Sequence, residues 1–310
     1  MTLSETRAAY RSGELSKHDY IQRMHGFHKA MLEYAEFVEG SDVSSIEIEP
    51  GRVVLRTLDA GIRIGLDSVD ERLIPLEIIN FGAYEPDETA MVLRLVEGTS
   101  TVFDIGANIG WYSLNIAARF GAAVDVHAFE PLPPTFDQLV ANIALNKADS
   151  IHAHRFGFSD ESCEKTFFYY PEGSGNASTA NLSERDDVER IACEVRTLDE
   201  YAAESGVMPG FMKCDVEGAE LMVFRGGRET IAKAHPIVFT EMLRKWSKAF
   251  GYSPNDIIDW FVDLGYACFN VSGSRLVPFD RVDEKTSETN FFFLHEVEHA
   301  DRIAGLLIAD

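Results

Sequence analysis

From about residue 70 onward, short apolar segments of strand length alternate with segments in which apolar residues recur at helical spacing. Consecutive parallel strands need a long crossover, usually a helix, so this alternation predicts a mostly parallel sheet covered by helices on both faces. We therefore expect a doubly wound, Rossmann-like α/β fold with a seven-stranded sheet. The expected strands span residues 99–103, 124–129, 151–156, 211–214, 236–240, 266–271 and 290–294, and helices are expected over 111–120, 133–146 and 254–264.

Two regions depart from this alternation. Residues 157–197 are expected to add strands and a mobile loop beside the sheet. At the N-terminus, Ser16 is placed to cap a helix, and residues 43–66 alternate polar and apolar side chains around two glycine-containing turns, which predicts a small antiparallel unit. We expect a helical and β-hairpin extension over residues 1–70 and the α/β domain over residues 71–310. The apolar residues at helical spacing in the extension are Ile21, Met24, Phe27, Met31, Tyr34 and Val38.

The chain is strongly acidic, with 51 Asp and Glu residues against 28 Lys and Arg residues and a formal net charge of -23. Such a surface repels phosphate groups, so neither a nucleic acid nor an anionic membrane is expected as a partner. A high net charge also keeps a protein dispersed in solution, which is an explanation that needs no ligand.

Nothing in the sequence predicts export or insertion into a membrane. The first 20 residues lack the apolar core of a signal peptide, and no run of about 18 apolar residues occurs. The four cysteines form no C-x-x-C pair and are expected to be reduced thiols. Together these features predict a cytoplasmic protein.

The most informative strand end is followed by a glycine turn in the segment VFDIGANIGWYSL, residues 102–114. Gly106 and Gly110 permit a tight turn and a close approach of a ligand to the backbone. The turn differs from G-x-G-x-x-G, which holds a pyrophosphate, and Asp104 before it suits a cationic aminoacyl group better than an anion. Glu130 ends the next strand, where an acid about 20 residues past such a turn accepts hydrogen bonds from ribose hydroxyls. The pair predicts an adenosine ligand that carries a sulfonium.

Eight short motifs of this chain occur in an order known from one family. In sequence and in order they resemble the FkbM family of class I, S-adenosylmethionine-dependent methyltransferases. The resemblance covers about residues 75–295 and leaves the first 70 residues unexplained. The motifs are YEPDE at 84–88, DIGANIGWYS at 104–113, FEPLP at 129–133, LVANIALN at 139–146, FSDE at 158–161, RTLDEY at 196–201, MKCDVEGAE at 212–220 and IVFTE at 237–241.

The resemblance implies that S-adenosylmethionine is the cofactor, and it implies which residues contact it. The turn from Asp104 to Gly110 would line the methionine and ribose part, Glu130 would hold the ribose hydroxyls, and Asp160 would approach the adenine amino group. Glu85 would close over the cofactor. The acceptor that the family favours is a hydroxyl of a sugar, glycan or polyketide. The implied cofactor-binding set is Glu85, Asp104, Gly106, Asn108, Gly110, Glu130, Pro131, Ser159 and Asp160.

Three acids at later strand ends are the candidates for catalysis. A neutral alcohol is a weak nucleophile, so a positioned carboxylate should take its proton during attack. Asp215 directly follows a central strand and is the expected base, with Glu241 and Glu217 orienting the acceptor. These acids could instead bind a divalent cation, or cap a helix and pair with Arg244, and the spacing does not distinguish the alternatives, so no metal ligand is predicted. Lys213 is expected to be a buried ion-pair partner of Asp215 or Glu241.

Other functions have weaker support in the sequence. A nicotinamide-dependent oxidoreductase would carry the G-x-G-x-x-G turn, and a binding module without catalysis would have damaged ligand positions, yet Asp104 and Glu130 are intact. HEVEH at 295–299 matches a zinc-protease pattern, but it follows a strand and has no obvious third ligand. The expected partner is a hydroxylated small molecule or glycan. The N-terminal extension is expected either to cap the acceptor site or to form a homodimer interface.

Overall fold

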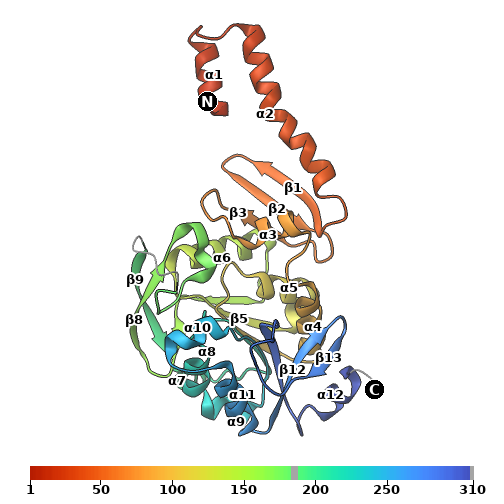
Figure 1. Ribbon diagram of the computed structural model, residues 1–310, viewed down its shortest axis with the longest axis vertical. Coiled ribbons are helices and arrows are strands. Elements are labelled where there is room, and N and C mark those ends of the chain that lie inside the picture. Colours follow the sequence, from red (N-terminus) through yellow and green to blue (C-terminus); the bar gives the residue numbers. More distant parts are fainter. Residues whose placement is uncertain (183–187, 308–310) are drawn as a thin grey trace.

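A computed structural model describes residues 1–182 and 188–307, and in it a helical arm stands clear of an α/β body (Figure 1). The arm contains two helices, and the Ser16 hydroxyl caps the second by accepting a hydrogen bond from the Asp19 amide at 3.1 Å, as expected. A small antiparallel sheet joins the arm to the body, which confirms the predicted turns and strands. These elements are α1 (Leu3–Arg11), α2 (Lys17–Phe37), β1 (Val43–Glu49), β2 (Arg52–Thr57) and β3 (Arg63–Leu66).

The body is built on a mostly parallel sheet, as the alternation of strands and helices predicts. The sheet has eight strands, one more than expected, because a short antiparallel strand, β13, extends one edge. From β11 to β6 all neighbours run parallel, whereas β14, β12 and β13 pair antiparallel. In spatial order the strands are β13 (Arg275–Pro278), β12 (Tyr266–Ser272), β14 (Asn290–His295), β11 (Ile237–Glu241), β10 (Phe211–Cys214), β4 (Thr101–Ile105), β5 (Asp125–Phe129) and β6 (Ile151–His154).

Helices cover both faces of this sheet, so the fold is doubly wound as predicted. Two buried apolar clusters lie on the two faces, because alternate residues of each strand point to opposite sides. One cluster packs against α3 (Ile74–Phe81), α4 (Pro86–Val96), α5 (Trp111–Phe120), α6 (Pro133–Asn146) and α12 (Ala300–Leu306). The other packs against α7 (Leu198–Ser205), α8 (Glu220–Gly226), α9 (Arg228–Ala234) and α11 (Pro254–Val262), while the short α10 (Arg244–Ser247) follows β11.

The insertion at residues 157–197 forms a second small sheet, which confirms the added strands. Its order is β7–β9–β8, with β7 parallel and β8 antiparallel to β9. A 3-10 segment, Pro171–Asn176, follows β8. Residues 183–187 of the predicted mobile loop lie outside the described residues. The strands are β7 (Gly157–Phe158), β8 (Cys163–Tyr169) and β9 (Glu189–Arg196).

The N-terminal sheet is fixed to the body through its strand β3. The side chain of Asn146 in α6 accepts from the Arg63 amide at 2.7 Å and donates to the Arg63 carbonyl at 2.6 Å. One helix turn earlier, Asn142 accepts from the Gly65 amide at 3.0 Å. These amides satisfy backbone groups that β3 would otherwise leave unpaired. The buried Leu55 of this sheet also belongs to the same apolar cluster as α5 and α6.

All four cysteines are free thiols, as expected; Cys163 is exposed and the other three are buried. None of the helices within the described ranges has both the length and the apolar character that crossing a bilayer requires.

Candidate active site

A cavity of about 440 Å³ opens at the carboxyl ends of β4, β5, β10 and β11. This is where ligands bind in open α/β sheets, and the volume is in the range of small-molecule sites. Acidic side chains dominate its wall, while Arg72 is the one basic residue among its described lining residues. The acids that line it are Asp70, Glu77, Glu85, Glu130, Asp215, Glu217 and Glu241.

The glycine turn after β4 is held against both neighbouring strands. The amide of Gly106 donates to the Phe129 carbonyl at 3.0 Å. Gly106 has φ +72°, and a Cβ at this position would lie 1.8 Å from the carbonyl oxygen of Asp215. Only glycine therefore fits between β5 and β10, and its fit brings the ends of β4, β5 and β10 to one edge of the cavity. Gly110, with φ +96°, lies behind this wall against Leu139.

Asp104 lies within β4 rather than directly after it, which corrects the predicted strand end. Its carboxylate is 1% exposed and supports the turn from below. Oδ2 accepts from the amide of Ser113 at 3.2 Å and from its hydroxyl at 2.6 Å. Asp104 is not among the described residues that line the cavity. Its hydrogen bonds to Ser113 instead fix α5 against the end of β4.

Glu130 lines the cavity at the end of β5, beside Pro131. Its two carboxylate oxygens accept from the amides of Asn108 at 3.1 Å and Leu132 at 3.0 Å. Burial raises the pKa of Glu130 to about 7, although both hydrogen bonds favour the charged form. Because β4 and β5 are adjacent, Asp104 and Glu130 lie on neighbouring strand ends, as the sequence predicts.

Glu85 precedes α4 and is held by two donors. The Tyr112 hydroxyl donates to Oε2 at 2.5 Å, and the Asn290 amide donates to Oε1 at 3.1 Å. Burial raises the pKa of Glu85, and the nearby Asp215 adds to the shift. These contacts fix the Glu85 carboxyl group in the wall of the cavity.

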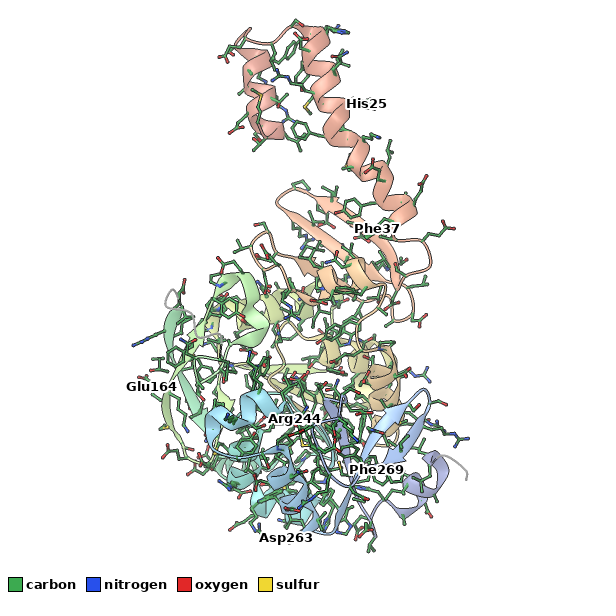
Figure 2. The ribbon with its side chains drawn as sticks, in the orientation of Figure 1. His25, Phe37, Glu164, Arg244, Asp263 and Phe269 are labelled. Atoms are coloured by element: carbon green, nitrogen blue, oxygen red, sulfur yellow. The ribbon has the colours of Figure 1, made fainter. Side chains whose placement is uncertain are left out.

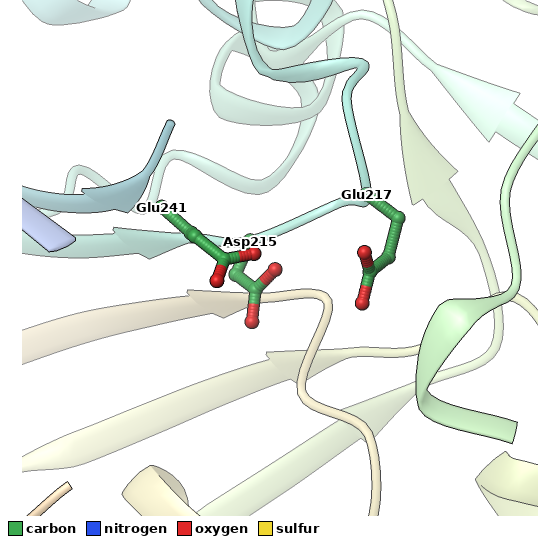
Figure 3. Close-up of side chains that lie close together, drawn as sticks. All are labelled: Asp215, Glu217 and Glu241. Carbon is green, nitrogen blue, oxygen red and sulfur yellow. The ribbon is translucent and has the colours of Figure 1, made fainter. Parts of the chain in front are cut away.

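Asp215, Glu217 and Glu241 form a group, named here the three-acid group, in which one oxygen from each lies within 4.8 Å of the others (Figure 3). Asp215 and Glu217 follow β10, and Glu241 ends β11. Burial and the neighbouring Asp215 raise the pKa of Glu241 to about 9 and the pKa of Glu217 well above its ordinary value. The structure thus brings the three predicted catalytic acids together.

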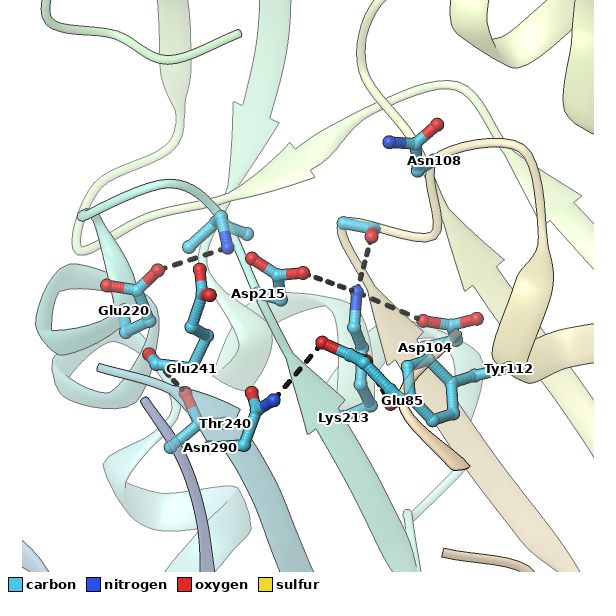
Figure 4. A network of polar contacts seen from close by, with 12 residues as sticks. Glu85, Asp104, Asn108, Tyr112, Lys213, Asp215, Glu220, Thr240, Glu241 and Asn290 are labelled. Carbon is cyan, nitrogen blue, oxygen red and sulfur yellow. Dashed lines mark hydrogen bonds and ion pairs between the residues drawn. The ribbon is translucent and has the colours of Figure 1, made fainter. Parts of the chain in front are cut away.

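Lys213 of β10 is the buried cation beside this group (Figure 4). Its ammonium donates to the Gly106 carbonyl at 2.6 Å and lies 3.4 Å from Asp215 Oδ2 and 3.7 Å from Asp104 Oδ1. Burial alone would lower the pKa of Lys213, but the carboxylates of Asp215 and Asp104 outweigh burial and raise it. The expected ion pair between Lys213 and Asp215 is confirmed. Among the described residues, Lys213 forms no ion pair with Glu241.

Ser159 and Asp160 lie apart from the cavity among the described residues. Lys165 donates to the Ser159 hydroxyl at 2.9 Å, and its ammonium lies 3.6 Å from Asp160. The main chain at Ser159 packs against Gly226 of α8. Their contact with adenine, implied by the family resemblance, stays a prediction.

Two alternatives raised by the sequence do not fit the contacts. Arg244 donates to the Asp283 carbonyl at 2.5 Å rather than to Glu241. In HEVEH, His295 ends β14 and α12 begins only after His299, and the His299 ring accepts from the His295 amide at 2.9 Å. The two histidines therefore do not share the helix face that a zinc protease requires.

Several residues that line the cavity were not identified from the sequence. Trp246 of α10 and Asp70 and Arg72 before α3 lie far apart along the chain, so only tertiary packing brings them together. One backbone feature does mark the site: Glu85, Asn108 and Glu217 all have left-handed backbone and all line the cavity. Such strained residues accumulate at functional sites.

The sequence profile described as the methyltransferase FkbM domain matches residues 104–268. This match contains the glycine turn, Glu130 and the three-acid group, and it covers more than half of the chain.

Individual relatives match between 44% and 64% of the chain. The 31-O-demethyl-FK506 methyltransferase FkbM of Streptomyces tacrolimicus is 29% identical over 44% of this chain and 65% of its own length. The hexuronic acid methyltransferase AglP of Haloferax volcanii is 28% identical over 46% and 56%. The AMB antimetabolite synthetase AmbE of Pseudomonas aeruginosa is 33% identical over 64% of this chain and 10% of its own length.

The chain spans less than two thirds of the length of each of these curated relatives. Among solved structures, the methyltransferase FkbM of Methylobacillus flagellatus aligns with a TM-score of 0.42 at 17% identity, covering 63% of this chain and 43% of that one. By its profile match, the chain belongs to the FkbM family of S-adenosylmethionine-dependent methyltransferases.

Proposed function

We propose that this protein is an O-methyltransferase that moves the methyl group of S-adenosylmethionine to a hydroxyl of a sugar, glycan or polyketide-type molecule. The observation that carries the proposal is the acid-lined cavity at the carboxyl ends of β4, β5, β10 and β11, directly beside the family's glycine turn.

The cavity suits this methyl donor in charge and in hydrogen bonding. S-adenosylmethionine carries a sulfonium and an ammonium, and seven acids against a single Arg favour a cationic ligand over an anionic one. The hydroxyl of Thr135 lines the cavity, is buried, and has no hydrogen-bond partner among the described residues. A buried polar atom without a partner is costly unless a ligand or water satisfies it. We infer that Glu130 and Asn108 hold the ribose and that Glu85 closes over the donor.

When bound, S-adenosylmethionine supplies a methyl group that is already activated for transfer. The chain's task is to align the acceptor oxygen with that methyl group, to exclude water and to remove one proton. Asp215 is our candidate base because the ammonium of Lys213, 3.4 Å away, stabilises its negative charge. As the acceptor oxygen gains the methyl group, its proton passes to the Asp215 carboxylate.

Glu241 and Glu217 are suited to a different task. With a pKa of about 9, Glu241 is protonated at neutral pH and can donate a hydrogen bond to the acceptor, and burial shifts the pKa of Glu217 in the same direction. We therefore assign to them the orientation of the acceptor rather than the removal of its proton.

The acid-rich wall also restricts the acceptor. A carboxylate on the acceptor would meet like charge on most sides, with Arg72 the only described lining residue to pair with it. The names of two relatives include a hexuronic acid and 31-O-demethyl-FK506. For this chain we infer that an uncharged acceptor, the hydroxyl of a polyketide-type molecule or of an uncharged sugar, fits the cavity better than a hexuronic acid does.

Calorimetric titration with S-adenosylhomocysteine and with NAD tests the proposal. We expect saturable heat with the first ligand and none with the second. Replacement of Asp215 by Asn should lower turnover strongly while the affinity for S-adenosylhomocysteine changes little. If wild-type protein shows no heat with S-adenosylhomocysteine, the proposal is wrong; if Asp215→Asn mainly loses that affinity, Asp215 binds the donor instead of acting as base.

For the N-terminal arm we propose self-association with a second copy of the chain. Met24, Phe27, Met31, Tyr34 and Val38 are separated by three or four residues in turn, which is the spacing of a coiled-coil seam. The side chains of Phe27, Met31 and Tyr34 are 37%, 50% and 47% exposed. Figure 2 shows α2 leading away from the body, from Phe37 to His25 and beyond.

The charges on α2 favour an antiparallel pair. Its first half carries Lys17 and Arg23 against Asp19, whereas its second half carries Glu33 and Glu36 against Lys29, so the first half is net basic and the second net acidic. A two-fold, antiparallel arrangement places the basic half of each helix beside the acidic half of the other. A parallel pair would place like charges together.

A further inference from the structure

The three-acid group differs from its acidic neighbours in what its oxygens contact. Glu85 receives hydrogen bonds from Tyr112 and Asn290. Glu220 receives them from the amides of Val216 and Gly218 and from the Tyr252 hydroxyl, at 3.0 to 3.1 Å. The structure therefore satisfies these two carboxylates with its own donors.

Two oxygens of the three-acid group are buried without such a donor. Asp215 Oδ1 and Glu217 Oε2 are inaccessible to solvent and have no hydrogen-bond partner within residues 1–182 and 188–307. Asp215 and Glu217 are half-buried as whole residues, so it is these two oxygens in particular that neither solvent nor a donor reaches. Burying a carboxylate oxygen without a partner costs a large amount of folding free energy. The two unpaired oxygens therefore indicate a bound ligand, and a metal cation is the ligand type that binds through oxygen lone pairs alone.

The charge balance points the same way (Figure 4). Lys213 is the ammonium that pairs with Asp215, and it is shared with Asp104 and with the Gly106 carbonyl. The single positive charge of Lys213 is thus shared by two carboxylates, Asp104 and Asp215, and Glu217 and Glu241 are two further acids beside them. The remaining negative charge faces the cavity.

We propose that Asp215, Glu217 and Glu241 bind a hard divalent cation of the Mg²⁺ to Ca²⁺ type, which would contact the acceptor hydroxyl. All three ligands are carboxylate oxygens, which these ions prefer, and the group lacks the sulfur and imidazole ligands typical of zinc. The proposal rests on the proposed O-methyl transfer and deepens it. With the ion bound, the ion orients the acceptor in place of hydrogen bonds from Glu217 and Glu241, and it lowers the pKa of the bound hydroxyl.

The spacing of the oxygens is compatible with such an ion. Two oxygens on opposite sides of an ion are separated by twice the metal–oxygen distance, about 4.2 Å for Mg²⁺ and about 4.6–5.2 Å for Ca²⁺. The oxygens of the three-acid group lie within 4.8 Å of one another. This limit lies within the span of two opposite Ca²⁺ ligands, whereas Mg²⁺ needs all three oxygens within about 4.2 Å of one another.

Direct binding of the ion gives the proposal a readout that does not depend on activity. We expect calorimetry of chelator-treated full-length protein with MgCl₂ or CaCl₂ alone to show one site per chain.

Isosteric variants locate the site. Glu217→Gln and Asp215→Asn should each weaken binding of the ion at least tenfold. Glu77→Gln is the matched control, because Glu77 lines the same cavity but lies outside the three-acid group, and it should leave ion binding unchanged. Thermal unfolding checks that each variant is folded.

Two results would overturn the cation site: no saturable heat with either ion, or equal binding by all three variants. A parallel titration with S-adenosylhomocysteine in the presence of a chelator separates the two proposals. If that ligand binds and neither ion does, only the cation site is wrong; if that ligand does not bind with or without the ion, the methyltransferase proposal itself is wrong.

Discussion

At the scale of single residues, the site depends on one position that tolerates no side chain. Gly106→Ala would place a Cβ 1.8 Å from the Asp215 carbonyl oxygen in left-handed backbone. We expect the free energy of unfolding to fall by about 3 kcal/mol, from strain and overpacking together, with loss of S-adenosylhomocysteine binding. Urea unfolding and calorimetry measure both.

Gly206→Ala is the control that measures the cost of left-handed backbone at a non-glycine residue without a steric clash. Gly206 has φ +71°, nearly the value of Gly106, but a Cβ there meets nothing within 4 Å among the described residues. It should cost only about 1–2 kcal/mol. Equal losses in the two variants would show that the contact with Asp215 contributes nothing.

The buried acids make stability depend on pH in a direction that can be worked out. The pKa values of Glu130 and Glu241 are raised in the folded state to about 7 and about 9, so the folded protein holds protons that the unfolded chain has released. Stability is therefore highest near pH 5 and falls as the pH rises through 7 to 9.

Glu241→Gln removes one of these titrations. In the presence of a chelator, we expect the free energy of unfolding to fall from pH 5.5 to pH 8.5 by at least about 1 kcal/mol less in this variant than in the wild type. Glu161→Gln, at an exposed position, should follow the wild-type curve. A wild-type curve that rises over this range would contradict the raised pKa values.

At the scale of elements, we propose a folding boundary that differs from the predicted one at residue 70. We propose that residues 43–66 fold with the α/β body, because Leu55, Ile62 and Ile64 lie in the same apolar cluster as α5 and α6. By contrast, the residues of α2 are exposed except for Tyr20 and Met24, which are half-buried.

Two deletions test this division. Removal of residues 1–39 should leave a cooperative unfolding transition and S-adenosylhomocysteine binding nearly unchanged. Removal of residues 1–66 should abolish cooperative unfolding, since it exposes the cluster under β1–β3 and leaves the side-chain amides of Asn142 and Asn146 without the backbone of β3. If both truncated chains unfold alike, the small sheet contributes nothing to the stability of the body.

The strands and helices of the body could largely be predicted because their apolar spacing is local. Helices α5 and α6 begin and end at the predicted residues. Strand β13 was missed because RLVP is short, contains a proline and pairs antiparallel at the sheet edge, where proline is tolerated. The alternation of strands with helices gives no sign of such a strand.

The site could be predicted only where the ends of neighbouring strands meet. Asp215, Glu217 and Glu241 follow adjacent parallel strands, so their proximity follows from topology. The burial of Asp104 beneath the turn and the contribution of Trp246 depend on side-chain packing across long sequence separations, for which a single sequence has no local signal.

At the scale of the whole molecule, the net charge of -23 has to be reconciled with self-association. Like-charged bodies repel, and that repulsion is screened beyond a Debye length of about 8 Å at physiological ionic strength. The arm carries α2 away from the body (Figure 1), so two copies that meet through their arms keep their acidic bodies apart. The antiparallel pair also matches the basic half of each α2 with the acidic half of the other.

This geometry predicts a dimer with a specific response to mutation. Sedimentation equilibrium should show a species of twice the 34.6 kDa chain mass, and Met31→Glu should return it to a monomer because a charge enters the apolar seam. Leu32→Glu is the matched control, since Leu32 is 70% exposed and lies outside the seam. A wild-type monomer at every concentration, or a dimer that persists in Met31→Glu, would rule out the seam as the interface. Because methyl transfer is completed within one body, the monomeric variant should retain its turnover per chain.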